Sequence, residues 1–312
     1  MSRAAPRNVV RIGLSAAIVS VSDEEPRVLA VHHDAGGDGL PFGPFDPLRH
    51  RTLENGLRTW VHEQTYLDLD YAEQLYTFGD RGRHMVKPGE GPRVVSVGYL
   101  ALVRAGAGLK APDTRWSAWY GYFPWEDRRT RKPEIIDAVI LPALKSFAKT
   151  DERHKDRVRL CFGLDGLPWD EERVLERYEL LYEAGLVEEA KRDGRQAALP
   201  ATPLGSSMIF DHRRILATAI ARLRGKMKYR PVVFELMGPH FTLLELQRTV
   251  EAISGVRLHK QNFRRLVEGG GLVEGTGKFT ALARGRPAEL FRFRREVLSE
   301  RPSPGLRFGM RR

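Results

Sequence analysis

The stretch FTLLELQRTVEAISG (241–255), followed by HKQNFRRLVEGG (259–270), decides the fold of the C-terminal part of the chain. In the first segment leucine, valine and isoleucine recur at spacings of three and four, which is typical of an amphipathic helix. Thr242 and Glu245 have the spacing of a capping box, and Gly255 ends the helix. The second segment predicts a shorter helix with basic and amide side chains on its outer side. Two short helices joined by a tight turn indicate a helix-turn-helix.

Two alternating segments follow these helices and predict a β-hairpin. They are LVEGTGKFTAL (272–282) and AELFRFR (288–294), and the loop between them contains Arg284 and Arg286. Alternation of apolar and polar residues is the pattern of half-buried strands. A helix-turn-helix followed by a hairpin indicates a winged helix, which we place at residues 225–300.

The charge of the chain is concentrated on this C-terminal part. Residues 225–312 hold 18 Lys and Arg against 8 Asp and Glu, a net charge of +10, whereas the whole chain carries +11. Residues 1–224 therefore carry only +1. Such a concentration is expected of a protein that binds the phosphate backbone of DNA and releases its counterions. The alternative is a solvated basic face on a module that binds other proteins.

Several polar residues of the winged helix are predicted to contact DNA. The amides of Gln261 and Asn262 can pair with adenine edges, and basic side chains can reach phosphate or guanine. The alternative for Asn262 is that it caps its own helix, and Arg286 can instead brace the wing. The predicted DNA-binding residues are Lys226, Lys228, Lys260, Gln261, Asn262, Arg264, Arg265, Arg284 and Arg286.

Length and composition suit a cytoplasmic protein with more than one domain. The chain has 312 residues, of which 42% are hydrophobic, and a single cysteine, Cys161. One cysteine excludes an internal disulfide, and its apolar neighbours predict a small buried residue. The N-terminus lacks the features of a signal peptide, and no apolar run reaches the roughly 18 residues of a membrane span. We expect a cytoplasmic location.

The N-terminal half predicts strands around one helix. VVRIGLSAAIVSV (9–21) and RVLAVHH (27–33) indicate a hairpin, and an amphipathic helix is predicted from about Thr52 to Thr65. A further strand, VVSVGYLALV (94–103), follows. Strands, a helix and strands again predict an α+β domain with a mixed sheet.

The residues of this half resemble a known family. LPFGPF (40–45), EQLYTFGDRGR (73–83) and IFDHRRILATAIARLRGKMKYRPVVFELM (209–237), together with the winged helix, are similar to the NAD-related transcriptional regulators (NrtR), which join a Nudix-like sensor to a winged helix. The resemblance covers most of residues 8–125 and 207–295. It implies that the sensor binds ADP-ribose or a related NAD metabolite and that this ligand alters DNA affinity.

The Nudix box tests whether the sensor is also an enzyme. In that box several carboxylates on one helix collect Mg²⁺, which polarises a pyrophosphate. Positions that require glutamate carry His50, Thr59 and His62, and Gly43 is one residue out of register. The residues that fit are Arg58, Trp60 and Glu63. We therefore predict a catalytically degenerate Nudix domain with no catalytic residues; the alternative is a Mg²⁺-dependent hydrolase of a nucleoside diphosphate derivative.

The resemblance implies that a nucleotide effector binds near the helix predicted at 52–65. It implies no required cofactor. Arginines can pair with diphosphate oxygens, and an aromatic ring can stack on adenine. The predicted ligand-binding residues are Arg49, Arg58, Glu63, Arg81, Arg83 and Phe45, with Arg51, His84, Phe42 and Tyr76 as further candidates. No metal site is predicted, because the histidines at 32, 33, 50 and 62 lack a metal-binding spacing.

An insertion separates the sensor from the winged helix. RWSAWYGYFPW (115–125) is rich in aromatic residues, which can face a ligand but more commonly pack between domains. Long helices are predicted at 133–149 and 168–193, joined by a segment at 155–167, and form a cap or a dimerisation element. The predicted divisions are 1–125 for the Nudix-like ligand-sensing domain, 126–206 for the helical insertion and linker, 207–224 for a connecting helix, 225–300 for the winged helix and 301–312 for a basic tail.

These observations predict a homodimeric, ligand-responsive transcriptional regulator. Two winged helices related by two-fold symmetry would read a near-palindromic DNA operator. The predicted partners are double-stranded DNA, a small nucleotide effector and a second copy of the chain, without a membrane. A third alternative makes the basic module a protein-binding platform and the Nudix-like half a scaffold.

Overall fold

The computed structural model describes residues 10–33, 36–80, 93–106, 108–280 and 287–306. Its strands are β1 (Val10–Ser22), β2 (Glu25–His33), β3 (Gly37–Gly39), β4 (Phe42–Pro44), β5 (Tyr71–Phe78), β6 (Arg93–Leu102), β7 (Thr114–Ala118), β8 (Val273–Phe279) and β9 (Glu289–Phe293). Its α-helices are α1 (Leu53–Thr65), α2 (Leu141–Phe147), α3 (Glu152–Phe162), α4 (Val174–Glu183), α5 (Glu188–Arg192), α6 (His212–Tyr229), α7 (Leu243–Ser254), α8 (Lys260–Gly269) and α9 (Val297–Glu300). Single turns of 3-10 or π-helix are η1 (Trp119–Gly121), η2 (Pro124–Glu126), η3 (Ile136–Ile140) and η4 (Val232–Leu236).

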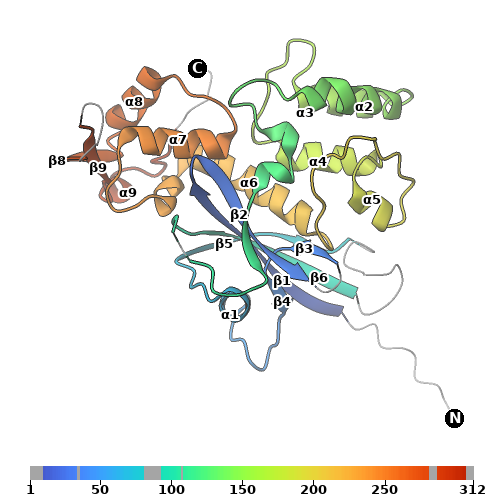
Figure 1. Cartoon of the computed structure of the whole chain (residues 1–312), viewed down its shortest axis with the longest axis horizontal. Helices are drawn as coiled ribbons and strands as arrows, with labels where there is room; N and C mark the ends of the chain where they lie inside the picture. Colours follow the sequence, from blue (N-terminus) through green and yellow to red (C-terminus); the bar gives the residue numbers. More distant parts are fainter. Residues whose placement is uncertain (1–9, 34–35, 81–92, 107, 281–286, 307–312) are drawn as a thin grey trace.

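The N-terminal unit is built on a mixed β-sheet (Figure 1). Strands β1 and β2 form the predicted antiparallel hairpin, and β6 pairs with β1 in parallel. The order is β3-β2-β1-β6-β5, with β4 beside β1 and β7 beside β2. Alternate residues of β1 face opposite sides, so that Leu14 and Ile18 enter one core while Ala17 and Val19 enter another. The predicted α+β class is confirmed.

Helix α1 forms where the amphipathic pattern predicted it and covers one face of the sheet. The Thr52 hydroxyl accepts a hydrogen bond from the Asn55 backbone N–H, which caps the helix N-terminus. Leu57 and Val61 are fully buried against the sheet. The indole of Trp60 lies over the backbone of β4 and donates to the Pro44 carbonyl at 2.8 Å.

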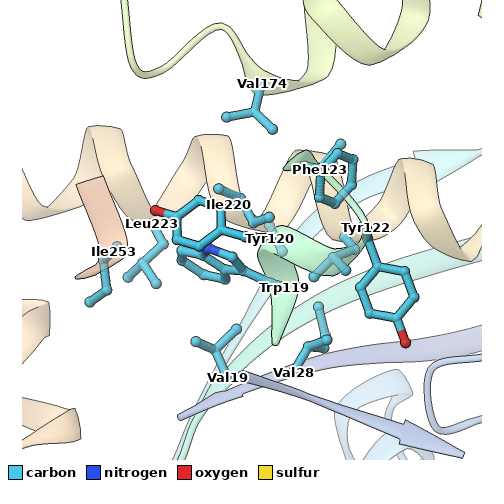
Figure 2. Close-up of a cluster of buried hydrophobic side chains, with 14 of the residues drawn as sticks. Val19, Val28, Trp119, Tyr120, Tyr122, Phe123, Val174, Ile220, Leu223 and Ile253 are labelled. Carbon is cyan, nitrogen blue, oxygen red and sulfur yellow. The ribbon is translucent and has the colours of Figure 1, made fainter. Parts of the chain in front are cut away.

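The aromatic segment after β7 fills the space between the sheet and the helices on its other face. Figure 2 shows Trp119 and Tyr120 between sheet residues such as Val19 and side chains of α6 such as Leu223, with Phe123 nearer to Val174 of α4. Trp119 and Phe123 have no solvent-exposed surface. This segment therefore packs between units, which was the commoner of the two alternatives that its composition allowed.

The helical insertion differs from its prediction in detail. The segment at 155–167, expected to be a connection, belongs largely to helix α3, because Asp151 caps the helix N-terminus and Gly163, at φ +60°, ends it. Cys161 is buried on this helix, as predicted. The first predicted helix begins with the π-turn η3, next to Pro142, whose missing N–H cannot support an ordinary helical turn. The second predicted helix is interrupted at Gly185, at φ +71°, into α4 and α5.

Helix α6 joins all parts of the chain. It runs without a break from His212 to Tyr229 and therefore crosses the boundary predicted at 224/225. Figure 1 shows it between the sheet, the insertion helices and the winged helix. Buried side chains of these parts form one continuous apolar cluster. Among the described residues, no helix combines the length and apolar character that a membrane crossing requires.

The contact between α1 and β4 predicts that Gly43→Ala destabilises the protein. A Cβ atom at Gly43 would lie 2.2 Å from the Trp60 indole, which is far inside van der Waals contact. Overpacking of this kind typically costs about 1–3 kcal/mol. The free energy of unfolding in urea measures the effect, and Gly121→Ala is the control because nothing lies within 4 Å of its added Cβ. Equal stability of the two variants would contradict the prediction.

Candidate functional site

The predicted helix-turn-helix is confirmed as helices α7 and α8. Glu245 and Thr242 form the capping box, in which the Glu245 carboxylate accepts from the Thr242 N–H at 2.7 Å and the Thr242 hydroxyl accepts from the Glu245 N–H at 3.1 Å. Gly255, at φ +73°, ends α7 in the left-handed conformation that glycine adopts without strain. Helix α8 begins five residues later.

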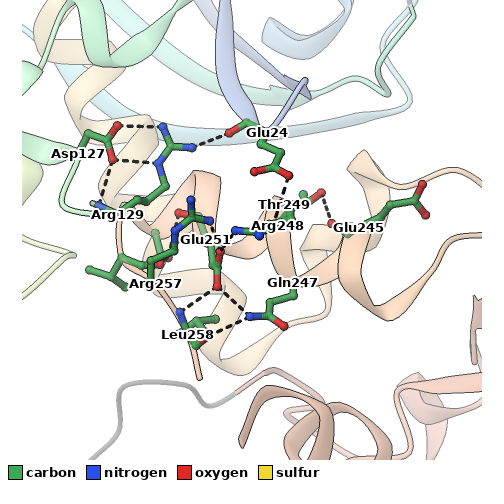
Figure 3. Close-up of polar contacts among 12 residues, drawn as sticks. Glu24, Asp127, Arg129, Glu245, Gln247, Arg248, Thr249, Glu251, Arg257 and Leu258 are labelled. Atoms are coloured by element: carbon green, nitrogen blue, oxygen red, sulfur yellow. Dashed lines mark hydrogen bonds and ion pairs between the residues drawn. The ribbon is translucent and has the colours of Figure 1, made fainter. Parts of the chain in front are cut away.

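A buried carboxylate fixes the turn between these helices (Figure 3). Glu251 is 2% exposed and accepts hydrogen bonds from the Leu258 N–H at 3.0 Å and the Arg257 guanidinium at 2.6 Å. It also accepts from Gln247 at 2.8 Å, and the same Gln247 amide donates to the Leu258 carbonyl at 2.9 Å. Arg248 completes the set at 3.2 Å. The residues just before α8 are therefore tied to α7 by directional bonds.

The charge of Glu251 is stabilised by these bonds. Burial by itself raises the pKa of the Glu251 carboxyl, but the hydrogen bonds from Leu258, Arg257 and Gln247 outweigh burial and hold the pKa below its ordinary value of 4.5. The carboxylate therefore contributes most to stability when it is ionised. The sequence carried a signal for this role, because an acidic residue in the last turn of a helix opposes the helix dipole and needs compensation.

Helix α8 presents a polar outer face. Phe263 and Val267 are buried against α7, which leaves the other side of the helix in solvent. Arg264 pairs with Glu268 at 3.0 Å within the helix, and Arg265 donates to the Asn262 side chain at 3.5 Å. The predicted DNA-binding residues that are exposed on this helix are Lys260, Gln261, Asn262, Arg264 and Arg265.

Strands β8 and β9 form the predicted wing. They pair antiparallel with a register shift between Gly275 and Phe279, and a bridge between Phe241 and Phe291 attaches the hairpin to the start of α7. Lys278 is exposed on the wing. The loop that carries Arg284 and Arg286 lies outside the described residues.

Two of the predicted DNA-binding residues, Lys226 and Lys228, form ion pairs with other units of the protein. Lys226 binds the Glu73 carboxylate at 2.6 Å and the Tyr71 hydroxyl at 2.8 Å, on strand β5 of the sensor. Lys228 binds Glu171 at 2.8 Å and Glu172 at 2.6 Å, beside the insertion helix α4. Both ammonium groups are neutralised by carboxylates of other units, so they do not belong to an exposed basic face.

The predicted ligand-binding residues around α1 form two ion pairs. Arg58 donates to Glu54 at 2.8 Å and also to the Leu69 carbonyl, which ties α1 to the segment before β5. Arg49 lies 3.6 Å from the Glu63 carboxylate. Both members of the Arg49–Glu63 pair are exposed, with 60% and 45% of their side-chain surface in solvent. Arg81, Arg83 and His84 lie outside the described residues.

The aromatic candidates divide into packed and accessible rings. Phe42 packs against the rings of His33, Phe210 and His212, with centroids 4.9–5.5 Å apart, and is half-buried. Phe45 is half-buried, with its ring centroid 5.9 Å from that of His50. Tyr76 is 62% exposed on β5.

The histidines near α1 have structural partners. His62 lies 3.1 Å from Asp68, and the Nδ1 atom of His50 accepts from the Asp46 N–H at 3.1 Å. In the described ranges, no three His, Cys, Asp or Glu side chains come together as metal ligands. The geometry offers exposed cations near α1 rather than a cluster of carboxylates.

Comparison with known proteins shows what the C-terminal part of the chain is similar to. Residues 233–293 match the family described as NrtR DNA-binding winged helix domain. Over 86 residues the chain is 44% identical to the ADPR responsive transcriptional repressor NtrR of Acinetobacter baylyi, a match that covers 28% of this chain and 34% of that protein. The match thus spans about a third of the length of this curated relative.

Two solved structures resemble the whole fold. One is Shewanella oneidensis NrtR complexed with a 27mer DNA, at 22% identity and a TM-score of 0.53, covering 92% of this chain and 95% of the other. The second is a MutT/nudix family protein from Enterococcus faecalis, at 16% identity and a TM-score of 0.54, covering 94% and 90%. The C-terminal domain of this chain is thus a winged helix of the NrtR type, and the predicted joining of a Nudix-like fold to it is confirmed.

The environment of Glu251 predicts a pH-dependent contribution to stability. Because its pKa is lowered in the folded protein, the contribution is complete above its ordinary pKa of 4.5 and is lost as the pH falls through the folded value. At about pH 7, Glu251→Gln should lower the free energy of unfolding by about 2 kcal/mol, since the remaining hydrogen bonds lose the charge of their acceptor and one acceptor oxygen is replaced by an NH2 donor.

Urea unfolding of the wild type and Glu251→Gln at about pH 7 and about pH 3.5 measures this contribution. The difference between the two proteins should shrink at the lower pH. A difference of the same size at both values would show that the Glu251 charge does not stabilise the turn.

Proposed function

We propose, from the NrtR-type winged helix that this chain carries, that the protein is a ligand-responsive transcriptional repressor that binds operator DNA through α8 and the wing. The observation that carries this proposal is the exposed face of α8, on which basic and amide side chains project from a helix whose entry is fixed by Glu251. A recognition helix must present its polar residues in a fixed direction to read base edges.

Electrostatics supports DNA as the partner. Residues 225–312 carry +10 of the net charge of +11. Lys226 and Lys228 are neutralised by carboxylates, and the cations of α8 and of Lys278 remain on the outer surface of the winged helix. Phosphate contacts from such cations give affinity that falls with salt, whereas Gln261 and Asn262 supply groups that can distinguish bases.

ADP-ribose or a related nucleotide is the proposed effector. The relative from Acinetobacter baylyi is described as ADPR responsive. In this chain Arg49 lies just before α1 with its guanidinium exposed, and Arg58 is a partly exposed residue of α1, so either guanidinium can pair with diphosphate oxygens. The half-buried Phe45 ring, next to His50, offers a surface on which a base can stack.

Binding without hydrolysis is the proposed role of the Nudix-like unit. Nudix chemistry needs several carboxylates around Mg²⁺, and the one carboxylate of α1 that fits the box, Glu63, lies beside the Arg49 guanidinium. A nearby cation disfavours a second cation at the same carboxylate. The competing function is a Mg²⁺-dependent hydrolase, which other proteins with a Nudix fold exemplify.

A homodimer completes the proposal. A two-fold pair of winged helices would bind two half-sites about one helical turn apart. Size-exclusion chromatography with light scattering measures the oligomeric state directly.

Replacement of Arg264 by alanine tests DNA recognition by α8. Loss of one charged contact should weaken operator binding about tenfold, which corresponds to about 1.4 kcal/mol. Fluorescence anisotropy of labelled DNA from the upstream region of the gene, against a scrambled duplex, measures the affinity. Unchanged affinity would remove Arg264 from the interface.

Replacement of Arg49 by alanine tests the effector region. Calorimetric titration with ADP-ribose should show about tenfold weaker binding, because a guanidinium–diphosphate pair is lost. Arg264→Ala is the control for this titration and should bind ADP-ribose normally, while Arg49→Ala should bind operator normally without nucleotide. Equal ADP-ribose affinity of the wild type and Arg49→Ala would place the nucleotide elsewhere.

Incubation of the wild type with ADP-ribose and Mg²⁺ separates the two proposed functions. A regulator should shift its operator affinity on adding ADP-ribose and leave the nucleotide intact. Multiple-turnover release of AMP would instead establish the hydrolase.

A further inference from the structure

Three charged side chains meet at a point where the sensor, the insertion, α6 and the winged helix converge. Glu126, Arg177 and Arg224, here called the joint, are each at most 1% exposed. The Glu126 carboxylate accepts from Arg177 at 2.6 and 2.9 Å and from Arg224 at 2.7 Å. Burial raises the pKa of Glu126, but the two guanidinium groups outweigh burial and hold the pKa below its ordinary value.

The joint extends into the winged helix through the C-terminal end of α7. Backbone carbonyls in the last turn of a helix lack partners within the helix and must find them elsewhere. Here the Ile253 carbonyl accepts from Arg224 at 2.8 Å, and the Ala252 carbonyl accepts from the Tyr120 hydroxyl at 2.7 Å. The Gly255 carbonyl accepts from the Arg128 N–H at 2.8 Å. Groups outside the winged helix therefore satisfy the carbonyls at the end of α7, just before the turn to α8.

The insertion holds the other side of the joint. Arg177 projects from α4, donates to the carbonyls of Cys161 and Asp170, both at 2.9 Å, and lies 3.8 Å above the Trp169 ring. The Glu171 carbonyl accepts from Arg224 at 2.9 Å. The insertion thus contacts α6 and, through Arg224, the winged helix.

We propose that the helical insertion is a brace that sets the orientation of the winged helix relative to the sensor, with Arg177 as the positioning residue. The continuous apolar core holds these units together, but apolar contacts are not directional and permit neighbouring elements to shift. The hydrogen bonds of the joint are directional and are satisfied in one arrangement only. The insertion is therefore part of the DNA-positioning frame rather than a separate cap over the sensor.

Arg177→Met tests the brace. This variant leaves Glu126 paired with Arg224 and removes the link to α4. Two spin labels are attached at Asp70→Cys in the sensor and at Gly269→Cys at the end of α8, in a Cys161→Ala background. Double electron–electron resonance then measures the distribution of distances between the sensor and the winged helix. Both labelled positions are exposed, and a Cβ at Gly269 meets nothing within 4 Å.

A broader or shifted distance distribution in Arg177→Met than in the wild-type background is the expected result. Arg157→Met is the matched control, because Arg157 pairs with Glu183 inside the insertion and does not reach the winged helix. Identical distributions for Arg177→Met and the wild type, or equal broadening by Arg157→Met, would overturn the proposal. If Arg177→Met does not fold, Lys228→Met is the second variant, because it removes the more exposed contact of α6 with Glu171 and Glu172 of the insertion. A label-distance distribution identical to that of the wild-type background would then overturn the proposal.

Operator affinity adds a second measurement, which rests on the proposed function. Arg177→Met should weaken specific binding at least about fivefold, although Arg177 is buried and cannot touch DNA, and Arg157→Met should not. Wild-type affinity in Arg177→Met would overturn the role in DNA positioning. Absence of specific binding by the wild type is a failure of the proposed function, and the label distances still test the brace.

Discussion

The fold depends on the burial of α6, against which the sheet, the insertion and the winged helix all pack. Ile215 lies against the sheet at Gly98, and Leu223 and Met227 are fully buried. Polar groups fix the same helix at both ends. Arg213 donates to the Tyr122 carbonyl near one end, and Arg224 reaches the joint near the other. Because α6 continues from the sensor into the entry of the winged helix, these units are connected by a rigid element rather than by a free linker.

The aromatic segment at 115–125 makes this arrangement possible. Its large rings fill the volume between the sheet and the helices on its other face, and each buried aromatic side chain contributes extensive apolar contact. Directional bonds also cross this junction, such as that from the Tyr120 hydroxyl to the Ala252 carbonyl at the end of α7. Apolar packing supplies cohesion here, and the buried charges specify one orientation among those that packing alone permits.

The basic residues of the chain serve two different purposes. Arg177, Arg213 and Arg224 are buried and paired with carboxylates, and they hold units together. Arg264 and Arg265 are exposed on α8, where their charge can act on a polyanion. On α1, ion pairs occupy a surface where metal-dependent Nudix enzymes need carboxylates, which fits a unit that binds a nucleotide and transmits its presence.

Local pattern determined much of this protein from the sequence alone. The capping box at Thr242 and Glu245, the outward face of α8, the wing and helix α1 follow from short-range spacing and propensity, which act within a few residues. The roles of Lys226 and Lys228 could not be predicted, because their partners lie 153 and 56 residues away along the chain. The joint could not be predicted for the same reason, since Glu126, Arg177 and Arg224 lie far apart along the chain and meet only in the folded protein. Sequence thus determined which elements form, whereas tertiary structure decided which charges are buried, because burial and ion pairing depend on contacts between distant segments.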